Sequence, residues 1–339
     1  MNGSPVPVAA LGGRGSRFPT PQEAGGGGCV PTRHAPALRF SHAVVAFLVL
    51  FPSAVSQAPA QEIVRRVGRV TFRVDASQAF PGGVVVVRLG SQGRLGAAWA
   101  LLDGRRAPFY SHGGVPRALV PVATTTEAGP ATLGIEIAAR RGEQRVAIPV
   151  TIAPRDYRPR YVFLSEEKRA LFGRREVGHD ARRLLAVLRT ESKEPAPGSL
   201  LPPVGIMGTG YGEPRTHTGT VEVESRIDGL QGERHRGLDY ALPAGTPVRA
   251  PAAGTVLFAG PLTLSGETIV IDHGQGVVSV RQYLSRIDVR LGDTLLAGAF
   301  VGLSGDTGLA PAPMLQWRVY LHGVAVDPMV LGPLLQRPL

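Results

Sequence analysis

Turn-forming residues interrupt the chain throughout, and they limit its helices more than any other feature of the sequence. Glycine occurs 44 times and proline 30 times in 339 residues. Glycine permits tight turns and weakens helices, while proline removes a backbone donor and blocks helix continuation. Hydrophobic residues make up 43% of the chain and charged residues 19%, as in globular proteins. We therefore expect two mostly β domains built from many short strands.

The first 60 residues have the order of a secretory signal. Arg33 and Arg39 precede a nine-residue apolar run at 43–51, and small residues then lead to the A-x-A pattern at 58–60. A spanning helix needs about 20 apolar residues. We predict that residues 1–60 are an N-terminal extension and signal peptide, that the protein is exported to the periplasm or cell envelope, and that no stable membrane span remains after cleavage. The alternative for the apolar run is a buried strand.

The net charge of +11 comes almost entirely from arginine, because Lys168 and Lys193 are the only lysines among 37 basic residues. Arginine pairs well with carboxylates and phosphates, so attraction to anionic polymers is expected. The sequence has no dense basic run, which argues against nucleic acid as a partner. The single cysteine, Cys29, lies before the apolar run, so the exported part can form no disulfide.

The part that follows the signal divides into three regions. Residues 61–155 alternate short apolar stretches with turn signals, which predicts an immunoglobulin-like β-sandwich. Residues 156–203 are predicted to be a linker with one helical stretch, which begins after the N-cap Ser165 and ends near Thr190, followed by a proline-rich segment. Residues 204–335 are predicted to be a second β domain, a compact sandwich or barrel-like hybrid with an antiparallel sheet.

The second domain carries specific motifs in a fixed order: GYGEPR at 210–215, HRGLDY at 235–240, GTPVRAPAAGTV at 245–256, VIDHG at 270–274, GLSGDTG at 302–308 and VDP at 326–328. Together they resemble the lysostaphin-type, or LytM-domain, zinc metallopeptidases, which cut peptidoglycan peptides. The resemblance covers about 130 residues. It implies an all-β domain with an antiparallel sheet core, a duplicated hybrid motif, and a zinc site made by residues of neighbouring strands.

His235 and Asp239 match two metal ligands of that family. In an extended segment their side chains begin on one face but lie about 13 Å apart, at ~3.3 Å per residue, which is too far to share one ion. A bend at Gly237 would bring an imidazole and a carboxylate to one zinc, which takes three protein ligands and a water in a catalytic site. A surface histidine and a turn aspartate are the alternative.

The remaining family positions do not carry the expected histidines. The family H-x-H pair falls on Met314 and Gln316, so Gln316 occupies the third ligand position, and a further histidine position is occupied by Tyr283. A thioether and an amide cannot replace imidazole as zinc ligand or base, and a tyrosine is a poor base at neutral pH. His217, His273 and His322 are the alternatives for a third ligand, but the pattern places each of them in a loop or turn.

Three functions follow from these residues. The first is an inactive homologue that needs no cofactor and binds a peptidoglycan peptide or a cell-wall hydrolase, with Arg249, Arg281 and Arg318 holding carboxylates. The alternative is an active zinc metalloendopeptidase with an altered ligand set. A biotinyl or lipoyl carrier, which a G-T-V…G-D pattern also resembles, is excluded because such carriers need a lysine and none follows Lys193. The histidine count favours the inactive homologue.

Overall fold

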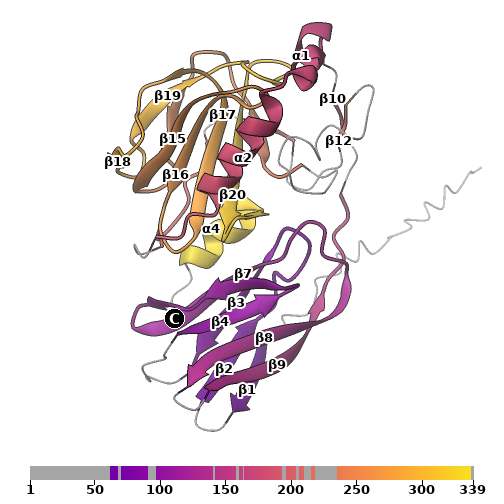
Figure 1. The fold of residues 1–339 in the computed structure, drawn as a ribbon, viewed down its shortest axis with the longest axis vertical. Helices are drawn as coiled ribbons and strands as arrows, with labels where there is room; N and C mark the ends of the chain where they lie inside the picture. Colours follow the sequence, from indigo (N-terminus) through magenta and orange to yellow (C-terminus); the bar gives the residue numbers. More distant parts are fainter. Residues whose placement is uncertain are drawn as a thin grey trace, which may run out of the picture. The chain divides into compact units, whose positions relative to one another are not determined.

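The computed structural model describes residues 62–67, 70–90, 97–139, 142–157, 160–162, 164–192, 196–203, 206–209, 215–217 and 235–336 (Figure 1). The predicted extension and signal segment, 1–60, lies outside these residues. Within the described part of the chain, no helix is both long enough and apolar enough to cross a membrane.

Two antiparallel sheets form the N-terminal part of the described chain. One sheet has the order β1-β2-β3-β7-β6 and the other β5-β4-β8-β9. The strands are β1 (Glu62–Val67), β2 (Val70–Asp75), β3 (Val84–Leu89), β4 (Ala98–Leu102), β5 (Arg105–Pro108), β6 (Tyr110–His112), β7 (Val115–Pro121), β8 (Gly129–Ala139) and β9 (Gly142–Ile152).

Apolar side chains from both sheets meet in one core. Phe72 and Val87 come from the first sheet, and Leu133 and Ile148 from the second, all fully buried. The β4–β5 hairpin shows why the sequence turns where it does: Asp103 and Gly104 both have positive φ, as a two-residue turn between right-twisted strands requires. The region is a two-sheet β-sandwich, and its immunoglobulin type stays a prediction.

The predicted helical stretch consists of two short α-helices separated by a 3-10 turn. Ser165 caps α1 (Glu166–Ala170), accepting a hydrogen bond from the Lys168 backbone N–H at 3.3 Å. The 3-10 turn η1 (Leu171–Gly173) leads towards α2 (Val177–Leu188), whose buried residues are Ala181, Leu184 and Leu188. These three residues lie at helical spacing on one face, so α2 packs against the second domain rather than standing free as a linker.

The C-terminal domain is a ten-stranded sheet with a main order of β11-β13-β20-β17-β16-β15-β18. Its pairings are antiparallel, and together with the sandwich they confirm the all-β prediction. The strands are β11 (Ile206–Thr209), β13 (Leu238–Ala241), β14 (Pro247–Arg249), β15 (Gly254–Leu262), β16 (Gly266–Asp272), β17 (Val277–Ile287), β18 (Thr294–Leu295), β19 (Phe300–Ser304), β20 (Met314–Leu321) and β21 (Val324–Val326). A separate parallel pair joins β10 (Arg160–Val162) to β12 (Arg215–His217).

The chain also has a helix that the sequence analysis did not expect. Helix α4 (Pro328–Gln336) follows β21, although only one helical stretch was predicted. Pro328 opens the helix and Leu331, Leu334 and Leu335 are buried against the sheet core. Pro333 lies inside α4 and hid the helical pattern, because an internal proline normally predicts a helix end.

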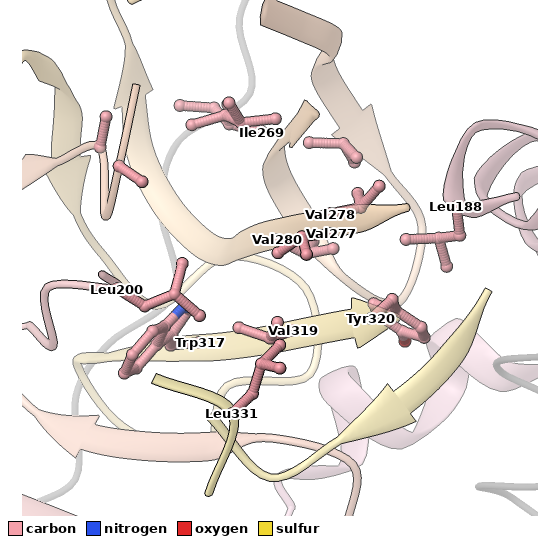
Figure 2. Close-up of a cluster of buried hydrophobic side chains, with 14 of the residues drawn as sticks. Leu188, Leu200, Ile269, Val277, Val278, Val280, Trp317, Val319, Tyr320 and Leu331 are labelled. Atoms are coloured by element: carbon pink, nitrogen blue, oxygen red, sulfur yellow. The ribbon is translucent and has the colours of Figure 1, made fainter. Parts of the chain in front are cut away.

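Strand β20 organises the domain because all eight of its side chains are buried. Side chains of a strand alternate between the two faces of the sheet. Trp317 and Val319 belong to the apolar core, which Figure 2 shows with Leu331 and Leu200 nearby. Gln316 and Arg318 therefore lie on the opposite face, so this face of the sheet carries buried polar groups that require partners.

Candidate functional site

Three neighbouring strands place one row of polar residues across the sheet. Asp239 on β13 is paired with Gln316 on β20, and Gln316 is paired with Gln282 on β17. Residues paired across antiparallel strands point to the same face, so all three side chains face the same side. Each is at most 3% exposed.

A close approach at Gly237 brings His235 to this row. Gly237 lies at a bend directly before β13. A Cβ at this position would lie 2.7 Å from Cγ of Arg318 and 2.8 Å from the carbonyl oxygen of Trp317, so only glycine fits against β20. With the bend, Nε2 of His235 and Oδ1 of Asp239 are 3.3 Å apart. Two donors bound to one tetrahedral zinc at ~2.0–2.1 Å would be separated by about 3.4 Å.

The side chain of Gln316 connects the polar residues. Its Nε2 donates to Oδ1 of Asp239 at 2.9 Å and lies 2.9 Å from Nε2 of His235, while its Oε1 accepts from Nε of Arg318 at 2.7 Å. Arginine is a donor only, so the carbonyl end of the amide must face Arg318 and the NH₂ end must face His235 and Asp239. Nε2 of His235 therefore accepts, and the ring carries its proton on Nδ1. We call His235, Asp239, Gln316 and Arg318 the amide cluster.

These residues do not fit a catalytic zinc ion. The lone pair that His235 Nε2 would give to a metal already accepts an N–H of Gln316, and the same amide group donates to Asp239. The only other group in the cluster is a guanidinium, which repels a cation. Zinc sites take nitrogen, sulfur and carboxylate donors, three of them at a catalytic centre. The cluster offers two such donors, and both are engaged with the amide.

Tyr283 and Met314 lie under an apolar cover. Both belong to a cluster of buried side chains that includes Leu164, and Phe172 packs against that cluster. Leu164 and Phe172 come from the segment around α1 and η1, which also donates a hydrogen bond from Lys168 Nζ to the carbonyl oxygen of Asp306. We call the segment from Leu164 to Phe172 the helical cover. Part of the predicted linker therefore packs directly on two of the family's functional positions.

Tyr283 also has an unusual backbone. Its φ of 68° lies in the left-handed region, at an irregularity between β16 and β17 where the register shifts. Such a bulge redirects the side chain relative to a regular strand. The side chain of Tyr283 is 7% exposed, within the apolar cluster that contains Met314.

The alternative histidines do not join the amide cluster. His273 is buried at the start of the β16–β17 turn, where Nδ1 lies 2.7 Å from the carbonyl oxygen of Ala253 and Nε2 lies 2.7 Å from Oγ of Ser279. Burial lowers the pKa of His273 to about 4. His322 follows the far end of β20 and contacts Glu191 at 2.9 Å. The side chain of His217 lies outside the described residues.

The three arginines predicted to hold carboxylates are divided between two places. Arg318 belongs to the amide cluster, whereas Arg249 and Arg281 line one cavity together. Sequence reasoning did not connect Arg318 with Gln316. The i, i+2 spacing on a strand was the signal that could have found this contact, because it places both side chains on one face. Gln282 was also missed: its buried amide has no hydrogen-bond partner in the part of the chain that the structure describes.

Comparisons with known proteins agree with the resemblance seen in the motifs. Residues 233–328 match the family model described as Peptidase family M23. The chain is 36% identical over 95 residues to the DD-carboxypeptidase/endopeptidase Mpg of Neisseria meningitidis, and 35% identical over 95 residues to the peptidoglycan DD-endopeptidase ShyA of Vibrio cholerae. Each match covers 28% of this chain, and the chain spans only 22% of the length of either relative.

A solved structure extends the likeness beyond the matched region. A crystal structure described as a peptidase M23 of Pseudomonas aeruginosa aligns with a TM-score of 0.55 and 29% identity. The alignment covers 75% of this chain and 95% of that one. Residues outside 233–328 therefore share their fold with that protein as well.

Proposed function

Residues 233–328 form a domain of the M23 peptidase family, and from this premise we propose that the chain is an exported, non-hydrolytic M23-type protein. Its role is to bind a peptidoglycan peptide or to regulate a cell-wall hydrolase in the periplasm or cell envelope. The single observation that carries this proposal is the amide of Gln316, which donates to both remaining ligand residues, His235 and Asp239.

The amide cluster supports a structural role for the former ligand positions. A buried histidine and a buried carboxylate need hydrogen-bond partners when no metal is present, since unpaired polar groups are costly inside a protein. Gln316 supplies a donor to each, and Arg318 fixes the orientation of the amide. The set is satisfied by the protein's own atoms. The amide occupies Nε2 of His235 and one carboxylate oxygen of Asp239, and this arrangement argues against a metal-activated water at the cluster.

The names of the relatives support the ligand class. Mpg and ShyA are described as a DD-carboxypeptidase/endopeptidase and a peptidoglycan DD-endopeptidase. Because residues 233–328 match the family of these relatives, a peptidoglycan peptide is the ligand we expect. The predicted signal in residues 1–60 supports export to the compartment where peptidoglycan lies.

The decisive experiment compares zinc uptake by the wild-type chain and by Gln316→His. The substitution places an imidazole at the third ligand position and removes the amide. We expect about one zinc per chain for Gln316→His and no stoichiometric zinc for the wild type. Gln336→His adds a histidine on an exposed helix end, and it serves as the control for nonspecific metal binding. Metal content is measured by mass spectrometry after dialysis against a zinc buffer.

The alternative function, an active zinc metalloendopeptidase, is tested with the same proteins. Wild-type chain that binds one zinc and releases peptides from purified peptidoglycan, with loss of activity in a chelator, would overturn the proposal. The positive role is tested by cosedimentation with peptidoglycan and by adding the chain to a purified cell-wall hydrolase. We expect retention on peptidoglycan or a change in the hydrolase rate, at equal zinc concentration.

A further inference from the structure

A cavity of about 310 Å³ lies on the face of the sheet opposite to the amide cluster. Arg281 and Leu315 line it, whereas their strand neighbours Gln282 and Gln316 point to the other face. The volume lies within the range of small-ligand pockets, roughly 300–1,000 Å³. The remaining walls are mostly apolar and come from the segment before β11, from β14 and from nearby turns, among them Leu201, Leu242, Val248 and Arg249.

Arg281 is the unusual member of this lining. It is 1% exposed, and its Nε and Nη1 have no hydrogen-bond partner among the residues that the structure describes. The other nitrogen, Nη2, donates to the carbonyl oxygen of Arg249 over 3.4 Å. The guanidinium lies over the ring of Trp317, 4.9 Å from its centroid, and the indole Nε1 is a further buried donor without a partner in the described chain. Buried donors therefore outnumber acceptors here.

The cavity also lacks a negative charge among its lining residues. Burial lowers the pKa of Arg281 to about 9, and the nearby Tyr240 opposes this shift. The guanidinium is therefore still protonated at neutral pH. Arg249 adds a second positive charge at the cavity, where its Nη1 donates to the carbonyl oxygen of Gly298 at 2.9 Å. A charge buried without a counterion is unfavourable, so an anion entering this cavity gains a charge-assisted hydrogen bond.

We propose that this cavity binds a small aliphatic carboxylate, with the carboxylate at Arg281 and the hydrocarbon tail against Leu242, Val248 and Leu315. The carboxylate oxygens accept from the unmatched N–H groups of Arg281. A tail of several carbons removes apolar surface from water on the remaining walls. Leu201 is 47% exposed at the cavity wall, and Nε and Nη1 of Arg281 are covered. Binding therefore requires Leu201–Pro203 to move aside.

Two sources present this chemistry equally well. A free aliphatic acid and the C-terminal carboxylate of a peptide that ends in an apolar residue have the same head group and a similar tail. The site does not depend on the proposed function, since it lies on the other face of the sheet and uses none of the amide cluster. A chain without zinc and a chain with zinc should bind the carboxylate alike.

The experiment titrates the full chain with hexanoate and with N-acetyl-leucine, and follows binding by calorimetry and by NMR of labelled leucine methyl groups. Hexanol and N-acetyl-leucine amide are the matched uncharged probes. The variants are Arg281→Met, which keeps the apolar volume and removes the charge, and Arg290→Met, an exposed arginine of the same domain, as the control. Because Arg281 has no acidic partner among the described residues, Arg281→Met should fold, and thermal unfolding checks this.

We expect the wild-type chain to bind at least one of the two acids saturably. The matching uncharged probe should bind at least tenfold more weakly than the acid. Arg281→Met should lose a similar factor in its affinity for the acid, whereas Arg290→Met should not. A shift of the Leu201 methyl signals should accompany binding. Binding of hexanoate alone identifies a free acid as the source, and stronger binding of N-acetyl-leucine identifies a peptide end. The proposal is wrong if neither acid binds, if the uncharged probes bind equally, or if folded Arg281→Met binds as the wild type does.

Discussion

Two buried arginines, Arg318 and Arg281, lie on adjacent strands and face opposite sides of the same sheet, yet their surroundings differ. Arg318 donates to Oε1 of Gln316 and so orients the amide cluster. Arg281 leaves two nitrogens without partners in the described chain and stacks on Trp317. Burial alone therefore does not make a charge structural. Where the chain supplies partners, the charge holds a network together, and where it does not, the charge remains available to a ligand.

Of the changes on the two faces of the sheet, Gln316→Met is expected to have the largest effect on the free energy of unfolding. This change keeps the volume but removes the amide, so His235, Asp239 and Arg318 each lose a hydrogen bond inside the protein. We expect the free energy of unfolding to fall by about 3–4 kcal/mol, the sum of several unsatisfied buried groups. Urea unfolding in a metal-free buffer measures it. A loss below about 1 kcal/mol would mean that the amide cluster contributes little to stability.

A second buried polar group, His273, tests whether burial also sets the pH dependence of stability. Burial lowers the pKa of His273 from its ordinary value of 6.5 to about 4 in the folded chain. The unfolded chain therefore binds a proton more readily, so stability is complete above about pH 6.5 and is lost as the pH falls towards 4. The full loss is about 3 kcal/mol.

Urea unfolding from pH 7 to pH 4 measures this dependence, and His273→Gln should flatten the curve. Gln retains a donor and an acceptor for Ala253 and Ser279. His179→Gln, at an exposed histidine, is the control and should leave the curve unchanged. Equal slopes in the three proteins would show that His273 does not control the acid side of the stability profile.

A smaller effect of the opposite sign is expected for Arg281→Met. Removing a buried charge that has no acidic partner in the described part of the chain should raise the free energy of unfolding by about 1 kcal/mol, after the loss of its contact with the Trp317 ring. The measurement uses the same urea series without added carboxylate. A destabilisation of more than about 1 kcal/mol would show that Arg281 supports the fold and would remove the contrast with Arg318.

A further prediction concerns the coupling free energy between Arg318 and Gln316. Single variants Arg318→Met and Gln316→Met, and the double variant, form a double-mutant cycle. A charge-assisted hydrogen bond at 2.7 Å predicts a coupling free energy of about 1–2 kcal/mol. The control cycle pairs Arg290→Met with Gln316→Met and should show no coupling. Additive single variants in the first cycle would mean that Arg318 does not position the amide.

Much of the fold could be predicted because local signals agree with it. Asp103 and Gly104 form the expected turn, and Ser165 caps the expected helix. Helix α4 was not predicted, since Pro333 breaks the sequence pattern while leucines pack the helix on the core. The helical segment was interpreted as a linker, because a sequence pattern shows an apolar helix face but not the distant residues that it covers.

The site was predictable at the level of positions but not of contacts. Chain order identified His235, Asp239 and Gln316 as one set, and the strand register places them together. The orientation of the Gln316 amide depends on Arg318, which motif matching treats as a surface charge. The cavity at Arg281 depends on Leu201–Pro203, over seventy residues away in the sequence, so no local pattern predicts it.

The helical cover over Tyr283 and Met314 affects how this domain can change during evolution. A reversion at position 314 or 283 would bury an imidazole beneath leucine and phenylalanine side chains, with no metal to compensate until Gln316 also changes. A histidine at either position therefore destabilises the fold, so the helical cover opposes these substitutions unless position 316 changes as well.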